Sequence, residues 1–146
     1  MNYPSLSMNG PILIVEDDED DQFIFNKIFS ELQIADKIKY FTNPAKALAF
    51  LREDPCQPFL IICDINLPVM NGLEFKTAID RDPILRAKSI PFVFLSTSTA
   101  RKMVDKAYKE LTIQGYFQKS DDYEDLKHRL CSILDYWQHC QHPNSP

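Results

Sequence analysis

The chain has 146 residues, of which 45% are hydrophobic and 25% are charged, so it suits one globular core and is too short for two comfortable domains. Its formal net charge of -5 and its scattered lysines and arginines argue against nucleic acid as a direct ligand. No apolar stretch approaches the roughly 20 residues that cross a bilayer, and residues 1–5 lack the regions of a signal peptide. We therefore expect a cytoplasmic protein that binds neither nucleic acid nor a membrane.

Short apolar runs bounded by turn residues alternate with stretches of helical period along the whole chain. This alternation is typical of a mostly parallel sheet covered by helices on both faces. The runs predict strands at residues 12–15, 37–41, 60–63, 92–95 and 115–117. The helical spacing predicts helices around 25–32 and over 44–53, 72–81, 100–111 and 122–140, and Asp121 with Glu124 resembles a capping box before the last of these.

Five strands with intervening helices predict an α/β fold with the flavodoxin-like, doubly wound strand order 2-1-3-4-5. In such a sheet, ligands bind outside the carboxyl ends of the strands at the point where the winding reverses, which is between the first and third strands. We expect one domain over residues 11–140, a flexible N-terminal extension over 1–10 and a disordered tail over 141–146.

Acidic residues follow both strands that flank this point. Asp64 comes directly after the apolar run 59–63, and Glu16 and Asp17 come directly after the run 11–15. If these strands are parallel neighbours, the carboxylates meet at one edge of the sheet, where two charges ~5 Å apart repel by roughly 3 kcal/mol at an effective dielectric constant of about 20. A bound divalent cation is the simplest way to relieve that repulsion.

The fourth and fifth predicted strands end in groups that complete such a site. Ser96 offers a hydroxyl at the end of the fourth strand, and Lys119 offers an ammonium group after the fifth. Carboxylates for a metal, a nucleophilic carboxylate, a hydroxyl and a lysine are the groups expected for phosphoryl transfer, which depends mainly on placement and charge neutralisation. In this chemistry Asp64 would attack phosphorus and become an acyl phosphate.

These residues resemble the receiver domain of bacterial two-component response regulators, and the resemblance covers about residues 11–137. The matching segments are 12–18, 61–74, 90–96 and 115–119, each at a predicted strand end. The resemblance implies the roles of the site residues: Asp64 as the phosphoacceptor, Glu16 and Asp17 with Asp64 and the Asn66 backbone carbonyl as ligands of Mg²⁺, and Ser96 and Lys119 as partners of the phosphoryl oxygens.

The resemblance also implies a partner and an output. The donor would be a phosphohistidine on a histidine kinase or histidine phosphotransfer protein. On phosphorylation Ser96 would move inward, Tyr116 would turn into the space that it leaves, and the face formed by the fourth helix, fifth strand and fifth helix would change shape for a downstream protein target. We expect a stand-alone, CheY-like regulator that takes part in its own phosphorylation and dephosphorylation and is not a metabolic enzyme; whether it forms a homodimer stays open.

The chain departs from the family pattern at two positions, and other interpretations remain. Ser120 stands where the family usually has proline, and Glu16 stands where aspartate is commoner. A haloacid-dehalogenase-like phosphatase also uses a strand-end aspartate, but it needs a second acidic residue where this chain has Asn66. A flavin-binding module would need a phosphate loop that the acidic segment 16–18 would repel, and a receiver that no longer takes phosphate would not need Asp64, Ser96 and Lys119 together.

Overall fold

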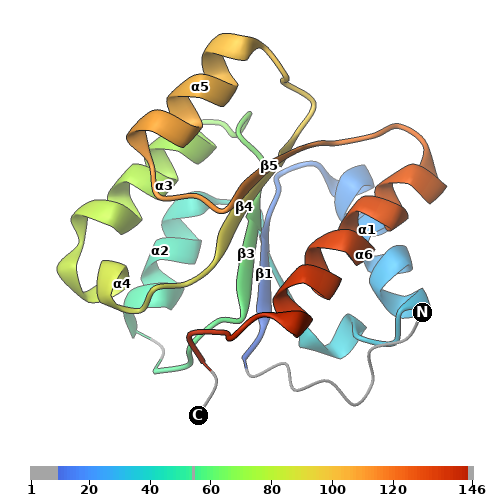
Figure 1. Cartoon of the computed structure of the whole chain (residues 1–146), viewed down its shortest axis with the longest axis horizontal. Coiled ribbons are helices and arrows are strands. Elements are labelled where there is room, and N and C mark those ends of the chain that lie inside the picture. Colours follow the sequence, from blue (N-terminus) through green and yellow to red (C-terminus); the bar gives the residue numbers. More distant parts are fainter. Residues whose placement is uncertain (1–9, 54, 145–146) are drawn as a thin grey trace.

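Five parallel strands form one sheet in the order β2-β1-β3-β4-β5 (Figure 1). The computed structural model describes residues 10–53 and 55–144. The predicted strand order is confirmed, and each strand lies within two residues of its predicted bounds. The strands are β1 (Ile12–Val15), β2 (Ile38–Phe41), β3 (Leu60–Cys63), β4 (Phe92–Ser96) and β5 (Gly115–Gln118).

Helices cover both faces of the sheet, as the sequence predicted (Figure 1). One hydrophobic core joins the sheet to α1 and α6, and a second core joins it to α2, α3, α4 and α5. The helices are α1 (Glu19–Glu31), α2 (Pro44–Glu53), α3 (Gly72–Arg81), α4 (Pro83–Ala87), α5 (Arg101–Glu110) and α6 (Tyr123–His139), and a short 3-10 helix spans Ala35–Lys37. No helix in the described part of the chain is both long and apolar enough to span a bilayer.

The register of the two central strands sets the position of their following residues. Every residue of β1 and of β3 is buried, as expected of strands with a helical layer on each side. Val15 lies opposite Cys63, and the Asp64 amide donates to the Val15 carbonyl at 3.0 Å. Glu16 and Asp64 therefore leave the sheet at the same level, on the same edge.

One prediction about a helix end is wrong, and one short helix was not predicted. The predicted capping box of the last helix does not form, because the N-cap of α6 is Asp122 and its side chain makes no capping hydrogen bond. A capping box is present instead at α3, where Asn71 and Glu74 each accept a hydrogen bond from the other's backbone amide. In addition, the chain continues after α3 into the unpredicted short helix α4, since Asp82 ends the first helix and caps the second.

The C-terminal segment differs from the expectation of a disordered tail over residues 141–146. His142 is 7% exposed, its ring stacks on Phe59 with the centroids 4.4 Å apart, and its Nε2 donates to the Phe59 carbonyl at 2.6 Å. Asn144 donates from its backbone amide to Nδ1 of His142 and from its side chain to the Gln57 and Pro58 carbonyls. Residues 141–144 thus pack beside the start of β3, whereas residues 1–9 and 145–146 lie outside the described residues.

Candidate functional site

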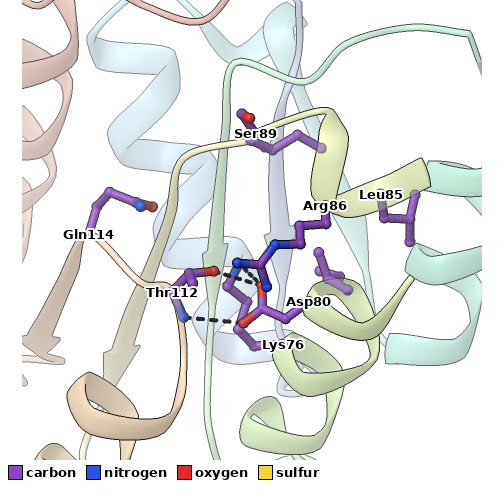
Figure 2. A pocket seen from close by; sticks show the side chains of 9 residues that line it. Lys76, Asp80, Leu85, Arg86, Ser89, Thr112 and Gln114 are labelled. Carbon is purple, nitrogen blue, oxygen red and sulfur yellow. Dashed lines mark hydrogen bonds and ion pairs between the residues drawn. The ribbon is translucent and has the colours of Figure 1, made fainter. Parts of the chain in front are cut away.

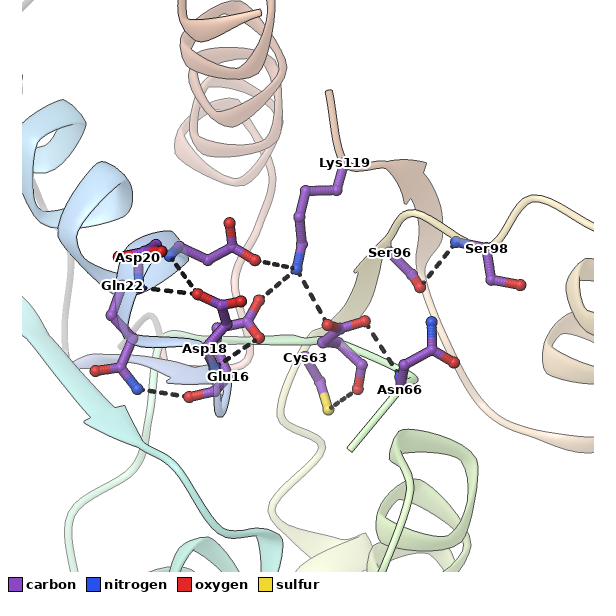
Figure 3. A network of polar contacts seen from close by, with 11 residues as sticks. Glu16, Asp18, Asp20, Gln22, Cys63, Asn66, Ser96, Ser98 and Lys119 are labelled. Carbon is purple, nitrogen blue, oxygen red and sulfur yellow. Dashed lines mark hydrogen bonds and ion pairs between the residues drawn. The ribbon is translucent and has the colours of Figure 1, made fainter. Parts of the chain in front are cut away.

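One lysine joins carboxylates from three elements at the carboxyl edge of the sheet (Figure 3). Lys119, which follows β5, donates from Nζ to the Glu16 carboxylate after β1 and to Oδ2 of Asp64 after β3, the latter at 3.1 Å. It also donates to Oδ2 of Asp21 in the first turn of α1 at 3.0 Å. The structure therefore brings Glu16, Asp64 and Lys119 into direct contact, although 103 residues separate the first from the last.

Burial gives this network its electrostatic character. Glu16 is 2% exposed, Asp64 9% and Lys119 8%. Loss of solvation raises the pKa of Glu16 to about 7, against the opposing effect of the hydrogen bond and charge of Lys119. Burial by itself would lower the pKa of Lys119, but the hydrogen bond that it donates to Glu16 and the charges of Glu16 and Asp64 outweigh this effect and raise that pKa. Lys119 is therefore the stable cation at the centre of the site.

The loop after β3 holds the Asp64 side chain and leaves little free space behind it. The Asn66 amide donates to Oδ1 of Asp64 at 3.2 Å, so each carboxylate oxygen has a donor. The Gly72 amide donates to the Ile65 carbonyl at 2.9 Å, which brings the start of α3 against the loop. A Cβ atom at Gly72 would lie 2.3 Å from the Asp64 carbonyl oxygen. Only glycine fits at this close approach.

The end of β4 is tied to β5 through a tyrosine. Ser96 is fully buried, and its Oγ accepts a hydrogen bond from the Ser98 amide at 3.2 Å. The Tyr116 hydroxyl donates to the Ser98 carbonyl, and its ring lies 6.0 Å from that of Phe94. The Lys119–Ser120 peptide bond is trans, as are all the peptide bonds of the described residues. Tyr116 thus links β5 to Ser98 in the β4–α5 loop, and the Ser98 amide in turn contacts Ser96 at the end of β4.

Asp17 is the one predicted metal ligand that stands outside this network. Its side chain is exposed, and within residues 10–53 and 55–144 it makes no hydrogen bond or ion pair. In the same residues no group of three or more histidine, cysteine, aspartate or glutamate side chains is arranged to hold a metal ion. The donors nevertheless suit a hard cation, because Glu16 and Asp64 are buried carboxylates that already share one positive charge.

Asp21 belongs to the network and was missed from the sequence. In the sequence it stands within the acidic run 18–21, whose composition is typical of the solvated first turn of a helix. Helical spacing could have separated it from the run, because Asp21 lies four residues before Phe25 and seven before Ile28, both of which are buried. The stripe that faces the sheet therefore extends to Asp21 and places its carboxylate beside Lys119.

Known proteins are similar in sequence to most of this chain. The family model of the response regulator receiver domain matches residues 12–131. The probable methanogenesis regulatory protein FilR2 of Methanothrix harundinacea (strain 6Ac) is 32% identical over 130 residues, which cover 86% of this chain and 82% of FilR2. The response regulator Rcp1 of Synechocystis sp. (strain ATCC 27184 / PCC 6803 / Kazusa) is 32% identical over 131 residues, which cover 86% of this chain and 87% of Rcp1.

Solved structures show the same fold. The phosphorylated cyanobacterial phytochrome response regulator RcpA superposes with a TM-score of 0.82 at 27% identity and covers 93% of this chain and 99% of its own. The Mn(2+)-bound form of response regulator Rcp1 superposes with a TM-score of 0.75 at 30% identity and covers 89% of this chain and 95% of its own. Receiver domains are signalling proteins rather than metabolic enzymes, and they interact with histidine kinases or phosphotransfer proteins. The chain, with its parallel 2-1-3-4-5 sheet and its match over residues 12–131, belongs to the response regulator receiver domain family of two-component signalling.

Proposed function

We propose that this protein accepts a phosphoryl group on Asp64 from a phosphohistidine donor, with Mg²⁺ present, and transmits the change to a protein target. The observation that supports the proposal best is the contact of Lys119 with both Glu16 and Asp64 at one edge of the sheet. It places a fixed positive charge beside the carboxylate that would attack phosphorus. Phosphoryl transfer needs this kind of placement and charge neutralisation more than it needs covalent chemistry by the protein.

Transfer would use the carboxylate of Asp64 as the nucleophile. An Asp64 oxygen would form a bond to phosphorus while the bond from phosphorus to the donor histidine nitrogen breaks, and the histidine would leave with that electron pair. The Asn66 amide and the Lys119 ammonium group would hold the carboxylate in one orientation. Lys119 and Ser96 would then bind oxygens of the transferred group. Because the product is an acyl phosphate, water would later restore the free carboxylate in the same site.

Mg²⁺ would be held by Glu16, Asp17 and Asp64 with the backbone carbonyl of Asn66. When bound, it would supply positive charge to the phosphoryl oxygens. The raised pKa of Glu16 supports this assignment, since a buried carboxylate gains most from a nearby cation. The Mn(2+)-bound form of the relative Rcp1 shows a divalent metal in a protein of this family. Asp17 is the least supported ligand because it is exposed.

The output would pass through Tyr116. Its hydroxyl donates to the Ser98 carbonyl, two residues after Ser96. A displacement of Ser96 toward a phosphoryl group would therefore change the geometry of this hydrogen bond. Tyr116 is also held by α5, because its backbone amide donates to the Tyr108 hydroxyl at 3.0 Å. The surface that changes would be the α4-β5-α5 face of the family, which α5, β5 and α6 form in this protein.

Incubation with acetyl phosphate, with and without Mg²⁺, followed by intact mass measurement, tests the proposal. We expect one phosphoryl adduct on the wild-type protein in the presence of Mg²⁺ and none when the metal is chelated. Asp64→Asn should abolish the adduct, while the matched control Asp36→Asn, in the exposed 3-10 helix, should keep it. An adduct of equal yield in Asp64→Asn would overturn the assignment of the phosphoacceptor.

A further inference from the structure

A cavity of about 240 Å³ lies between α3, α4 and the connection from α5 to β5 (Figure 2). Among its lining residues are Ile90 and Gln114, which come just before β4 and β5. The cavity therefore opens at the amino edge of the parallel sheet, whereas Asp64 and Lys119 lie at the carboxyl edge. It is separate from the proposed phosphorylation site and is not explained by it.

The carboxylate in the cavity already accepts three hydrogen bonds. Asp80 accepts a hydrogen bond at Oδ1 from the Lys76 ammonium group at 2.8 Å, in an ion pair whose lysine side chain is only 5% exposed. The Thr112 hydroxyl donates to the same oxygen at 2.7 Å, and the Thr112 amide donates to Oδ2 at 3.2 Å. Asp80 thus neutralises Lys76 and fixes the α5–β5 connection to α3, and it has little capacity left for a second cation.

A second cation, Arg86, is present and lacks an ion pair within the described residues. Its guanidinium group extends toward Lys76 and Asp80 in Figure 2. The two cations are near enough to interact: burial lowers the pKa of Lys76, the contacts with Asp80 oppose this, and the charge of Arg86 lowers it further. With two cations and one carboxylate, the charged groups of the cavity carry a net charge of +1.

The side-chain amide of Gln114 also offers a donor rather than an acceptor. The Oε1 atom of Gln114 accepts from the Phe92 amide at 2.6 Å, so its NH₂ group is the part left for another partner. Ser89 also lines the cavity, but its hydroxyl already donates to the Ala87 carbonyl at 3.5 Å. Beside these polar groups stand the apolar side chains of Ile79, Leu85 and Ile90, each at most 8% exposed. The cavity combines one excess positive charge, a spare amide donor and an aliphatic wall.

We propose that this cavity binds a small monocarboxylate with a short aliphatic tail. The single negative charge of such a ligand balances the net charge of the cavity, and Arg86 can bind a carboxylate through two parallel N–H groups. The tail would contact Ile79 and Leu85. A free phosphate has the charge to interact with Arg86 but has no group that could use the aliphatic wall. For so small a ligand, a dissociation constant on the order of 1 mM is expected.

Titration with isovalerate at constant ionic strength, followed through the backbone amide resonances of Ser89, Thr112 and Gln114 by NMR, tests the proposal. We expect saturable shifts at these amides, and weaker shifts with inorganic phosphate. Arg86→Met should weaken binding about tenfold or more, because it removes a charged hydrogen-bonding group and leaves the exposed aliphatic stem. Arg81→Met is the matched control, since Arg81 is an exposed arginine at the end of α3 and does not line the cavity.

The outcomes separate this site from general charge attraction and from the phosphorylation site. Asp64→Asn should bind isovalerate like the wild type, so a failure of the proposed function would leave this result unchanged. Absence of saturable shifts would overturn the proposal, as would equal weakening by Arg86→Met and Arg81→Met. Tighter binding of phosphate than of isovalerate at the same amides would overturn the assignment of an aliphatic carboxylate.

Discussion

The Tyr40 hydroxyl lies buried on the edge strand β2 without a hydrogen-bond partner among the described residues. Burial raises the pKa of Tyr40 to about 12. A buried polar group that lacks a partner costs about 1–3 kcal/mol relative to its solvated state. Tyr40→Phe removes the hydroxyl and keeps the ring that packs on the α1 side of the sheet. We therefore expect this variant to gain about 1 kcal/mol in the free energy of unfolding, measured by urea denaturation.

Tyr108 provides the control for this substitution. Its hydroxyl accepts a hydrogen bond from the Tyr116 amide at 3.0 Å. Tyr108→Phe removes this hydrogen bond and should therefore be neutral or destabilising. If Tyr40→Phe is destabilised as much as Tyr108→Phe, the Tyr40 hydroxyl has a partner in solution and the argument from its burial is wrong.

The meeting of Glu16 and Asp64 at one edge of the sheet was predictable from the sequence, because it depends on few degrees of freedom. Glu16 and Asp64 directly follow strands that are buried throughout, so parallel pairing alone brings them to one edge. The positions of Asp17 and Asp21 were harder to predict, because the side on which each residue lies depends on how the chain turns from β1 into α1. Asp18 caps that helix by accepting from the Asp20 and Asp21 amides, and this turn leaves Asp17 exposed and directs Asp21 to Lys119.

At the scale of single elements, the start of α3 carries a measurable share of stability. Asn71 accepts from the Glu74 amide at 2.9 Å, and Glu74 accepts from the Asn71 amide at 3.0 Å. Asn71→Ala removes the side-chain acceptor and leaves an amide of the first turn without its partner. The free energy of unfolding should fall by about 1 kcal/mol in urea denaturation.

Asp122→Ala is the matched control for the cap, because Asp122 occupies the N-cap of α6 without a side-chain hydrogen bond to it. This variant should lose much less stability than Asn71→Ala. Equal losses would mean that the hydrogen bond at the cap is not the source of the effect and that the two residues act through backbone preference alone.

The helices and strands were predictable where burial produces a regular pattern of apolar residues. They were less predictable where one residue ends a helix and also begins the next. The apolar runs predicted the central strands β1, β3 and β4 well, because a strand buried between two helical layers is apolar on both faces. In the sequence, the Asp82–Pro83 step indicates only that a helix ends there. Asp82 closes α3 and also accepts from the Ile84 and Leu85 amides, so it begins α4 at once. Two consecutive aspartates, Asp121 and Asp122, likewise do not reveal which one caps α6.

At the scale of the whole molecule, contacts between distant segments that lack a periodic signal escaped prediction. The fold class followed from alternating apolar and amphipathic segments, which report on burial over the whole chain. The packing of His142 on Phe59 joins residues 83 positions apart through one aromatic contact and one hydrogen bond. A polar segment after a helix looks the same in sequence whether it packs on the domain or not, so residues 141–144 were expected to be disordered.

The charge balance at the carboxyl edge of the sheet gives a prediction about the stability of the whole domain. Lys119 is in contact with the carboxylates of Glu16, Asp21 and Asp64, which come from three elements. Lys119→Met leaves these carboxylates without their cation. Removing one partner of a buried ion pair costs about 3 kcal/mol or more, so the melting temperature in the presence of a chelator should fall clearly below that of the wild type. Lys127→Met, which breaks the exposed pair with Glu31, should change it little.

Mg²⁺ should have a larger effect on the Lys119→Met variant than on the wild type. A ligand that binds only the folded state stabilises it by an amount that grows with its concentration relative to its dissociation constant. In the wild type, Mg²⁺ must share Glu16 and Asp64 with an ammonium group, whereas in the variant it meets carboxylates that repel one another. The rise in melting temperature on adding Mg²⁺ should therefore be greatest in Lys119→Met and equal in Lys127→Met and the wild type. Equal rises in all three proteins would show that the metal binds away from these carboxylates, because removal of the lysine must change the affinity of a cation that is bound among them.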